Sequence, residues 1–423
     1  MPLSYASRGG FLPETLLPGA VSDAALRHCP RSPRRSLPYP GRVHYLDHAA
    51  TTPVLPEVRA AVLAYLDNDF GNPSSVHAYG RAARRGVEDA RERVAAAIGA
   101  SPAEIVFTAG GTEADNLALK GVASKLKGNG NHLITSAIEH HAVLESVHRL
   151  ERDGFEVTVL DVDSDGLIDP RTLRSAMRRS TVAVSLMAVN NEVGTVQDMS
   201  LVTEVIKEAN PRTLVHTDAV QALGNVPVDV TAWGVDLASF SAHKLGGPKG
   251  TGALYIRSGV PVAAQLHGGG HERGLRSGTL NAPGIAGFGI AAEIAAKEVH
   301  EKAERLLALR ARMLDGIRSA VPDVVVNGSL ERRVPGNLNV SIPGAAGETL
   351  LLLLDQAGIA CSSGSACQSG AVDPSHVLLA LGVPRDLADG SLRFSLGRAS
   401  TDGDVDALLE ALPEVVVRAR KVA

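Results

Sequence analysis

Short apolar runs alternate with amphipathic, helix-like segments along residues 43 to 257. The runs lack a clean alternation of apolar and polar residues, which is typical of strands that are covered on both faces. Helix-like patterns lie between them, for example at 82–97, 113–125 and 143–153. The pattern predicts an α/β fold with a mainly parallel, seven-stranded sheet flanked by helices. The seven predicted strands lie at 104–109, 132–138, 156–162, 181–189, 213–220, 235–241 and 252–257.

A second, smaller α/β unit follows a glycine-rich stretch at 258–279. We therefore expect a large domain over 43–280 and a small domain over 281–423. The predicted elements of the small domain are a long helix at about 285–317, strands near 324–326 and 337–342, a helix at about 347–357, a strand ending near Cys361, a loop, a helix from Ser375, the strand LRFSL and a last helix from Asp402.

Residues 1–42 differ in composition from the rest of the chain. They contain seven prolines, six arginines and no lysine, with Glu14 and Asp23 as the acidic residues. Such a segment is typical of a disordered extension. An arginine-rich, acid-poor leader also resembles an organelle transit peptide, but the prolines interrupt an amphipathic helix, so a tail or a misplaced start site is an equal alternative. We exclude this extension from the predicted fold.

The composition excludes several classes of function. Lysine and arginine number 42 against 46 acidic residues, a net charge of −4, so the chain lacks the positive charge that nucleic-acid and anionic-membrane binding require. Aromatic residues make up only 3% of the chain, which disfavours base stacking. No stretch approaches the roughly 18 apolar residues of a membrane span, and the first residues lack a signal-peptide core. We expect a cytoplasmic protein with no membrane partner and no direct nucleic-acid partner.

The spacing of cysteine and histidine argues against a disulfide framework and against a metal site. Cys29, Cys361 and Cys367 are too few for such a framework, and none forms a CxxC pair. A leftover thiol is either a small core residue or a nucleophile, and composition leaves both open. His267 and His271 flank three glycines, but no third ligand lies nearby, so we expect a loop there.

Two predicted strands end in residues suited to pyridoxal phosphate. Lys244 follows the strand at 235–241, and the carboxyl ends of parallel strands are where open α/β sheets bind ligands. A lysine there can form a Schiff base with that cofactor, although a lone lysine in a loop is more often a surface residue. Asp218, near the end of the strand at 213–220, can pair with the pyridine nitrogen, or act as an ordinary helix N-cap.

Two further strand ends complete this pattern. Gly110, Gly111 and Thr112 follow the first predicted strand and open a helix, so their N–H groups and hydroxyl are placed to hold a phosphate. Thr112 and Asp115 also fit a plain capping box. His140 follows the second predicted strand, where an imidazole can stack on a cofactor ring or serve a structural role. Together, the four strand ends predict a pyridoxal phosphate site.

Ten short segments between residue 43 and about residue 402 resemble the motifs of one known enzyme family. They are YLDHAATTP (45–53), GNPSS (71–75), FTAGGTEADNLA (107–118), IEHHAV (138–143), VNNEVGTVQD (189–198), HTDAVQ (216–221), SFSAHKLGGPKG (239–250), HGGGHERGLRSGT (267–279), SSGSAC (362–367) and LRFSLGR (392–398). The chain closely resembles the pyridoxal-phosphate-dependent cysteine desulfurases of the class V aminotransferase family, which have fold type I. SSGSAC together with HGGGHERG is the most specific part of the resemblance.

The resemblance implies a role for each matching residue. Lys244 would bind the cofactor covalently, Asp218 would pair with its pyridine nitrogen, and His140 would stack on its ring. Arg393 and Asn191 would bind the substrate carboxylate, for which a planar guanidinium is well suited, and Arg398 is the weaker candidate. Two residues, Asn191 and Gln221, would contact O3′ of the cofactor. The phosphate would be held by Gly111, Thr112, Ser241 and His243. Thr279 of the neighbouring subunit would also contact the phosphate, which makes the enzyme an obligate homodimer.

The resemblance also assigns the sulfur-accepting nucleophile to Cys367. Its loop is rich in serine and glycine, as expected if the thiol moves between the cofactor and an outside acceptor. Cys361 ends an apolar segment, and we expect it in the core. The implied reaction takes sulfur from L-cysteine, releases alanine and leaves a persulfide on Cys367. The sulfur then passes to an acceptor, such as an iron–sulfur scaffold protein or an enzyme of tRNA or cofactor thiolation.

Two alternatives share much of this pattern. A selenocysteine lyase or a transaminase of the same fold would use most of the cofactor shell, but Cys367 in SSGSAC argues against both. A non-catalytic sulfur-relay protein should have lost Lys244 or Asp218, and this chain retains both. Only 25 residues follow Arg398, fewer than in the family members whose tail docks the scaffold protein, so the acceptor stays open.

Overall fold

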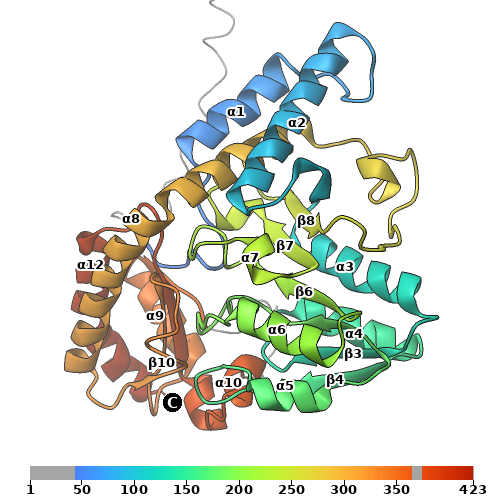
Figure 1. Ribbon diagram of the computed structural model, residues 1–423. Helices are drawn as coiled ribbons and strands as arrows, with labels where there is room; N and C mark the ends of the chain where they lie inside the picture. Colours follow the sequence, from blue (N-terminus) through green and yellow to red (C-terminus); the bar gives the residue numbers. More distant parts are fainter. Residues whose placement is uncertain (1–42, 364–373, 423) are drawn as a thin grey trace, which may run out of the picture. The chain divides into compact units, whose positions relative to one another are not determined.

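The computed structural model describes residues 43–363 and 374–422. Its largest sheet has seven strands (Figure 1). The strand order is β2-β8-β7-β6-β5-β3-β4. The pairs from β7 to β4 are parallel, and β8 is antiparallel to both neighbours, so β2 again runs parallel to β7. All seven predicted strands are present, which confirms the α/β class. The strands are β2 (Ile105–Thr108), β3 (His132–Ser136), β4 (Glu156–Leu160), β5 (Thr181–Ser185), β6 (Leu214–Asp218), β7 (Leu237–Ser241) and β8 (Gly252–Ile256).

Helices bury both faces of this sheet, because neighbouring residues of a strand point to opposite faces. On β2, Val106 packs into a cluster with α3 and α4, whereas Phe107 packs into a cluster with α2, α6 and the first half of α8. Burial on both faces explains why the strands lack a polar side in the sequence. The helices around the sheet are α1 (Pro56–Asp67), α2 (Ala78–Ala97), α3 (Gly111–Leu126), α4 (His141–Arg152), α5 (Pro170–Ala176), α6 (Met199–Ala209), α7 (Val230–Trp233) and α8 (Ala282–Ala320).

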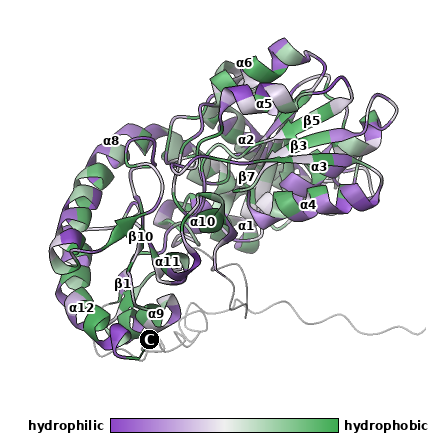
Figure 2. Cartoon of the chain, turned by 90° about the horizontal axis from the view of Figure 1, so that it is seen from below, coloured by the Kyte–Doolittle hydropathy of each residue, from purple (hydrophilic) through white to green (hydrophobic). Residues whose placement is uncertain are grey.

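A smaller core forms around a three-stranded antiparallel sheet with the order β12-β10-β9. The helix α8 reaches both cores: Phe288 in its first half packs on the large sheet, and Leu309 in its second half packs in the smaller cluster. Figure 2 shows hydrophobic and hydrophilic residues alternating along α8, as a helix with one buried face requires. The domain boundary near residue 280 stays a prediction. The other elements here are β1 (His44–Tyr45), β9 (Val325–Val326), β10 (Asn337–Ser341), α9 (Gly347–Gln356), β11 (Ile359–Ala360), α10 (His376–Ala380), α11 (Arg385–Asp389), β12 (Ser391–Ser395) and α12 (Asp402–Arg420).

The helix expected from Ser375 consists of two short helices. Ser375 is the N-cap of α10, and its hydroxyl accepts a hydrogen bond from the N–H of Leu378 at 3.2 Å. Pro384 is the N-cap of α11, and the helical conformation is disfavoured for the residue before a proline. In the part of the chain that the structure describes, no helix is both long and apolar enough to cross a membrane. The expectations for residues 1–42 fall outside the described residues.

A buried ion pair fastens the glycine-rich stretch to the edge of the large sheet. Arg91 of α2 donates two hydrogen bonds to the Glu272 carboxylate, at 2.7 and 2.8 Å. The same carboxylate accepts the backbone N–H of Phe107 at 2.7 Å, on the edge strand β2. Glu272 has a positive φ of 47°, a conformation that costs free energy, so these three bonds hold a strained loop in place.

We expect Arg91→Met to destabilise the fold by about 3–5 kcal/mol, because it leaves the Glu272 carboxylate buried without its partner. The matched control is Arg93→Met on the same helix, whose pair with Glu293 is much more exposed; we expect a loss below about 1 kcal/mol. Urea unfolding of the two variants measures both free energies. Equal losses in the two variants would contradict this account of the ion pair.

Candidate active site

Predicted site residues from four strand ends meet at one edge of the large sheet. Asp218 ends β6, Lys244 follows β7 in the short 3-10 helix η3 (Ala242–Lys244), and His140 is the N-cap of α4 after β3. Asp218 and His140 present ligand atoms within 4.8 Å of one another. The strands β2, β3, β6 and β7 run parallel, so their carboxyl ends share this edge. The convergence follows from the topology.

The side chains at this edge influence each other's protonation. Burial raises the pKa of Asp218, and the nearby His140 and Lys244 counteract this by favouring the carboxylate. Burial lowers the pKa of His140, and its Nδ1 accepts the N–H of Ala142 at 3.1 Å. The imidazole is therefore neutral near pH 7, with its proton on Nε2. A neutral ring beside a carboxylate suits a flat, cationic heteroaromatic ligand.

Lys244 is held by the segment that opens the described chain. Its Nζ donates hydrogen bonds to the carbonyl oxygens of Ala49 at 2.6 Å and Ala50 at 2.9 Å. The carbonyl of Ala49 also accepts Nε2 of Gln221 at 2.9 Å, and the N–H of Thr52 bonds to the carbonyl of His243 at 2.9 Å. The motif YLDHAATTP thus packs against the lysine and orients it at the edge of the sheet.

The start of α3 forms a cradle that suits a phosphate. Gly111 is required here, because a Cβ at this position would lie 2.7 Å from Cγ2 of Val220. The backbone N–H groups of Gly111 and Thr112 have no acceptor within the described residues, and they open a helix at its positive end. Ser241, His243 and Lys249 line the same cavity. This donor set fits a phosphate group.

The capping box considered for Thr112 and Asp115 is wrong. The N-cap of α3 is Gly110, which makes no side-chain cap bond, and Asp115 is buried. Oδ1 of Asp115 has no hydrogen-bond partner, lies 3.6 Å from Nε2 of His216, and presents a ligand atom within 4.8 Å of Asp218. Burial and the neighbouring Asp218 raise the pKa of Asp115 well above its usual range. Protonated, Asp115 leaves Asp218 as the anionic group at this edge. The sequence feature that could have indicated the burial of Asp115 is its place among the apolar residues of α3.

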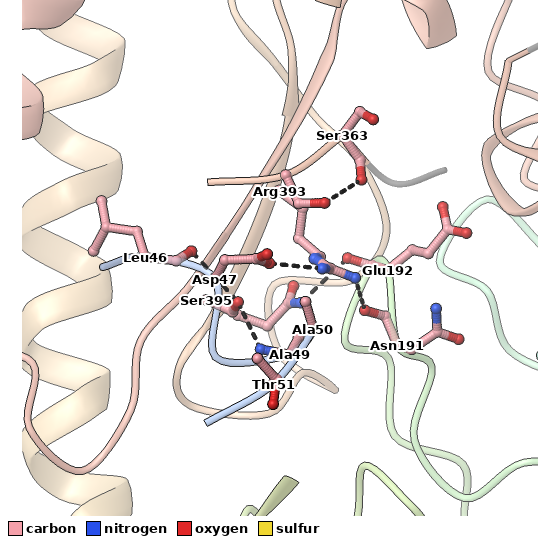
Figure 3. A network of polar contacts seen from close by, with 12 residues as sticks. Leu46, Asp47, Ala49, Ala50, Thr51, Asn191, Glu192, Ser363, Arg393 and Ser395 are labelled. Atoms are coloured by element: carbon pink, nitrogen blue, oxygen red, sulfur yellow. Dashed lines mark hydrogen bonds and ion pairs between the residues drawn. The ribbon is translucent and has the colours of Figure 1, made fainter. Parts of the chain in front are cut away.

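Arg393 of β12 lies beside Asn191, as Figure 3 shows. Its Nη1 donates to the carbonyl of Asn191 at 2.9 Å, and its Nη2 bonds to Oδ1 of Asp47 at 2.8 Å. Nε of Arg393 and Oδ1 of Asn191 are buried without a hydrogen-bond partner. Buried unpaired polar atoms are costly, so this donor and acceptor are suited to a ligand. Sequence reasoning missed Asp47, because its partner lies 346 positions away.

The other predicted residues differ in where they lie. Thr112 borders the phosphate cradle, whereas Thr279 is exposed and does not line that cavity. Arg398 pairs with Glu298 at 2.7 and 2.8 Å, an ion pair that favours a structural role for this arginine.

Of the three cysteines, the structure describes one. Cys361 follows β11 and packs against the smaller core, as expected. Burial, and to a lesser extent Asp47, raises the pKa of the Cys361 thiol to about 12, so this thiol is unreactive near neutral pH. Cys367 and Cys29 lie outside the described residues, and so does the expectation that the Cys367 loop moves.

Known proteins match nearly all of the chain. The aminotransferase class-V family matches residues 44–408. The cysteine desulfurase IscS of Anaeromyxobacter sp. (strain Fw109-5) is 51% identical over 382 residues, 90% of this chain and 94% of the relative. IscS of Dictyoglomus turgidum is 47% identical over 379 residues, 90% of this chain and 96% of the relative. The solved structure of a NifS-like protein superposes with a TM-score of 0.84 at 42% identity, covering 89% of this chain and 100% of that one. The chain therefore belongs to the class-V aminotransferase family, among its IscS-like and NifS-like cysteine desulfurases.

Proposed function

We propose that this protein is a pyridoxal-phosphate-dependent cysteine desulfurase. It removes sulfur from L-cysteine, releases L-alanine and carries the sulfur as a persulfide on Cys367. The observation that carries the proposal is the convergence of Lys244, Asp218 and His140 beside the phosphate cradle, with Arg393 and Asn191 presenting unpaired buried atoms. The names of the relatives support the same activity.

The site residues fit the cofactor as follows. Gly111, Thr112, Ser241 and His243 would hold the phosphate, Lys244 would form the covalent bond, and His140 would stack on the ring. Asp218 would pair with the pyridine nitrogen, and Gln221 and Asn191 would contact O3′. Bound there, pyridoxal phosphate supplies an electron sink for the charge that forms at the substrate Cα.

The protein's own residues carry out the remaining steps. Arg393 binds the substrate carboxylate and fixes the orientation of the amino acid. The amine of Lys244 removes the Cα proton as a general base. The Cys367 thiolate then attacks the substrate sulfur: a bond forms between the two sulfur atoms, and the Cβ–S bond breaks. The electron pair of the broken bond stays with the carbon skeleton, which takes up protons and leaves as alanine.

The sulfur passes from Cys367 to an acceptor protein, either an iron–sulfur scaffold or an enzyme of tRNA or cofactor thiolation. We place this reaction in the cytoplasm, with no direct contact to nucleic acid or membrane. The charge balance of the chain supports the absence of a polyanion partner.

The enzyme acts as a homodimer in which Thr279 of each copy completes the phosphate site of the other. Thr279 is exposed in the single chain. A group of exposed apolar side chains lies on α1, on α2 and in the segment between these helices. Such a group supports a protein interface on this part of the chain. The group includes Leu63, Leu66, Phe70, Val76 and Tyr79.

We expect sedimentation to show a dimer. We also expect Thr279→Val to weaken pyridoxal phosphate binding by roughly tenfold or more, because one hydrogen bond to a charged group is lost. Thr279→Ser keeps the hydroxyl and should retain the affinity. A fully active, cofactor-loaded monomer would overturn the proposed assembly.

The activity is tested by measuring alanine and total persulfide plus sulfide from L-cysteine. We expect equal amounts of the two products from the native protein. In Arg393→Lys we expect the KM for L-cysteine to rise roughly 10–100-fold, because lysine replaces a bidentate pair of hydrogen bonds to the carboxylate by a single hydrogen bond. Cofactor affinity should not change. The matched control Arg398→Lys alters the pair with Glu298 and should leave the KM as it was. Pyruvate in place of alanine, or a KM insensitive to Arg393, would contradict the proposal.

A further inference from the structure

A second cavity borders Lys244 and extends to the helix α8. Its volume is about 110 Å³, and its walls come from segments within 48–55, 190–191, 221–225, 244–246, 294–302, 334–337 and 395–399. A water molecule needs roughly 10–15 Å³ of such space, so the cavity has room for a ligand of about seven to eleven non-hydrogen atoms. None of the cofactor or substrate contacts proposed above uses the part of the cavity along α8.

Lys302 of α8 supplies a positive charge to this cavity. Its Nζ donates one hydrogen bond, to Oδ1 of Asn225 at 3.1 Å, whereas an ammonium group has three N–H donors. Among residues 43–363 and 374–422, Lys302 forms no direct ion pair, and both oxygens of the neighbouring Glu298 are bonded to Arg398. Burial lowers the pKa of Lys302 to about 8, so the amine is still mostly protonated at pH 7. The carboxylate of Glu298 acts on this ammonium without a direct bond, so two of its N–H donors remain for an anionic ligand.

His48 adds a second donor on the wall of the cavity. Its ring nitrogens have no hydrogen-bond partner within the described chain. Burial, followed by the charge of Lys302, lowers the pKa of His48 to about 4, so the ring is neutral with one N–H to donate. Gly397 makes room for this ring, because a Cβ there would lie 2.3 Å from Nδ1 of His48. The position of the imidazole therefore depends on glycine at 397.

Part of the lining is apolar. Leu245, Ile294, Ala295, Val334 and Leu396 border the cavity from four separate segments. A ligand that matches both parts has an anionic head and a short hydrocarbon body.

We propose that this cavity binds a small aliphatic monocarboxylate, with its carboxylate at Lys302 and His48 and its hydrocarbon chain against the apolar wall. Because Lys244 and Asn191 border the same cavity, the bound acid slows the enzyme; this regulatory part rests on the proposed function. The binding itself does not.

The affinity depends on pH in a direction that follows from the charges. On α8, the groups near Lys302 are Glu298 and Arg305, and the other walls bring His48 and Arg398. The pKa of His48 is lowered to about 4 and the arginines stay charged, so among these groups Lys302 is the one whose charge changes between pH 6 and 10. Binding is therefore expected to be strongest below about pH 8 and to be lost as the pH rises above it.

Calorimetric titration of the cofactor-loaded full chain with butyrate tests the proposal. We expect butyrate to bind, and butyramide and butylamine, which have similar size but no negative charge, to bind at least tenfold more weakly. Lys302→Met keeps the hydrocarbon stem and should weaken butyrate binding at least tenfold. The control Lys297→Met, on the same helix with an exposed side chain, should leave the affinity unchanged.

A second variant keeps the result independent of any folding defect in Lys302→Met. Ala295→Leu fills the cavity without changing a charge and should also abolish butyrate binding, while the KM for L-cysteine stays measurable. The proposal is overturned if butyrate fails to bind, or if either variant retains the native affinity. It is also overturned if butyrate binding survives Lys302→Met but is lost in Arg393→Gln, because the acid then occupies the substrate site.

Discussion

Replacing Cys367 by alanine is expected to lower sulfur transfer from L-cysteine by roughly 10³-fold or more, while cofactor binding stays unchanged. In the proposed mechanism the thiolate acts only after Lys244 has removed the Cα proton, so the earlier steps do not need it. The measurement compares persulfide and sulfide formation with the cofactor dissociation constant of the same variant. Turnover at the native rate would refute the assignment of the nucleophile.

Cys361→Ala is the matched control, because it removes the other thiol of the same region. Burial raises the pKa of Cys361 to about 12, so its thiolate is scarce near neutral pH. We expect native activity and a loss of roughly 1 kcal/mol in stability from the lost packing. A large loss of activity in this variant, with Cys367 intact, would reverse the roles of the two cysteines.

The second large effect is expected for Lys244→Ala. This variant should lack the visible absorption of the bound cofactor, and its rate of alanine formation should fall by at least about 10³-fold. The charge of the Lys244 amine acts on both Asp218 and His140: it lowers the pKa of each of them. Reduction of the native protein with borohydride, followed by peptide mapping, should place the cofactor on Lys244.

Two other lysines serve as controls for this assignment. Lys249 lines the phosphate cradle, and Lys120 bonds through Nζ to Oδ1 of Asn116 on α3. Alanine at either position should leave the covalent attachment intact. A reduced cofactor found on Lys249 or Lys120 would exclude Lys244 as the attachment site.

The sequence predicted the parts of this molecule that depend on local order along the chain. Each of Gly111, His140, Asp218 and Lys244 follows or ends a recognisable apolar run, and parallel topology brings such strand ends to one edge. The fold class and these site positions were therefore accessible without coordinates.

The parts that the sequence could not predict depend on partners far apart in the chain. Asp47 meets Arg393 across 346 positions, and Arg91 meets Glu272 across 181, so no local pattern marks either pair. Asp115 had a local explanation as part of a helix cap, but it is buried close to Asp218 instead.

The most direct test of the whole account is mass spectrometry of the native protein after brief exposure to L-cysteine. We expect one additional sulfur atom on the peptide that contains Cys367, removable by a thiol reductant, and none in the Lys244→Ala variant. Additional sulfur on the peptide of Cys361 or Cys29, or unchanged labelling of Cys367 in Lys244→Ala, would contradict it.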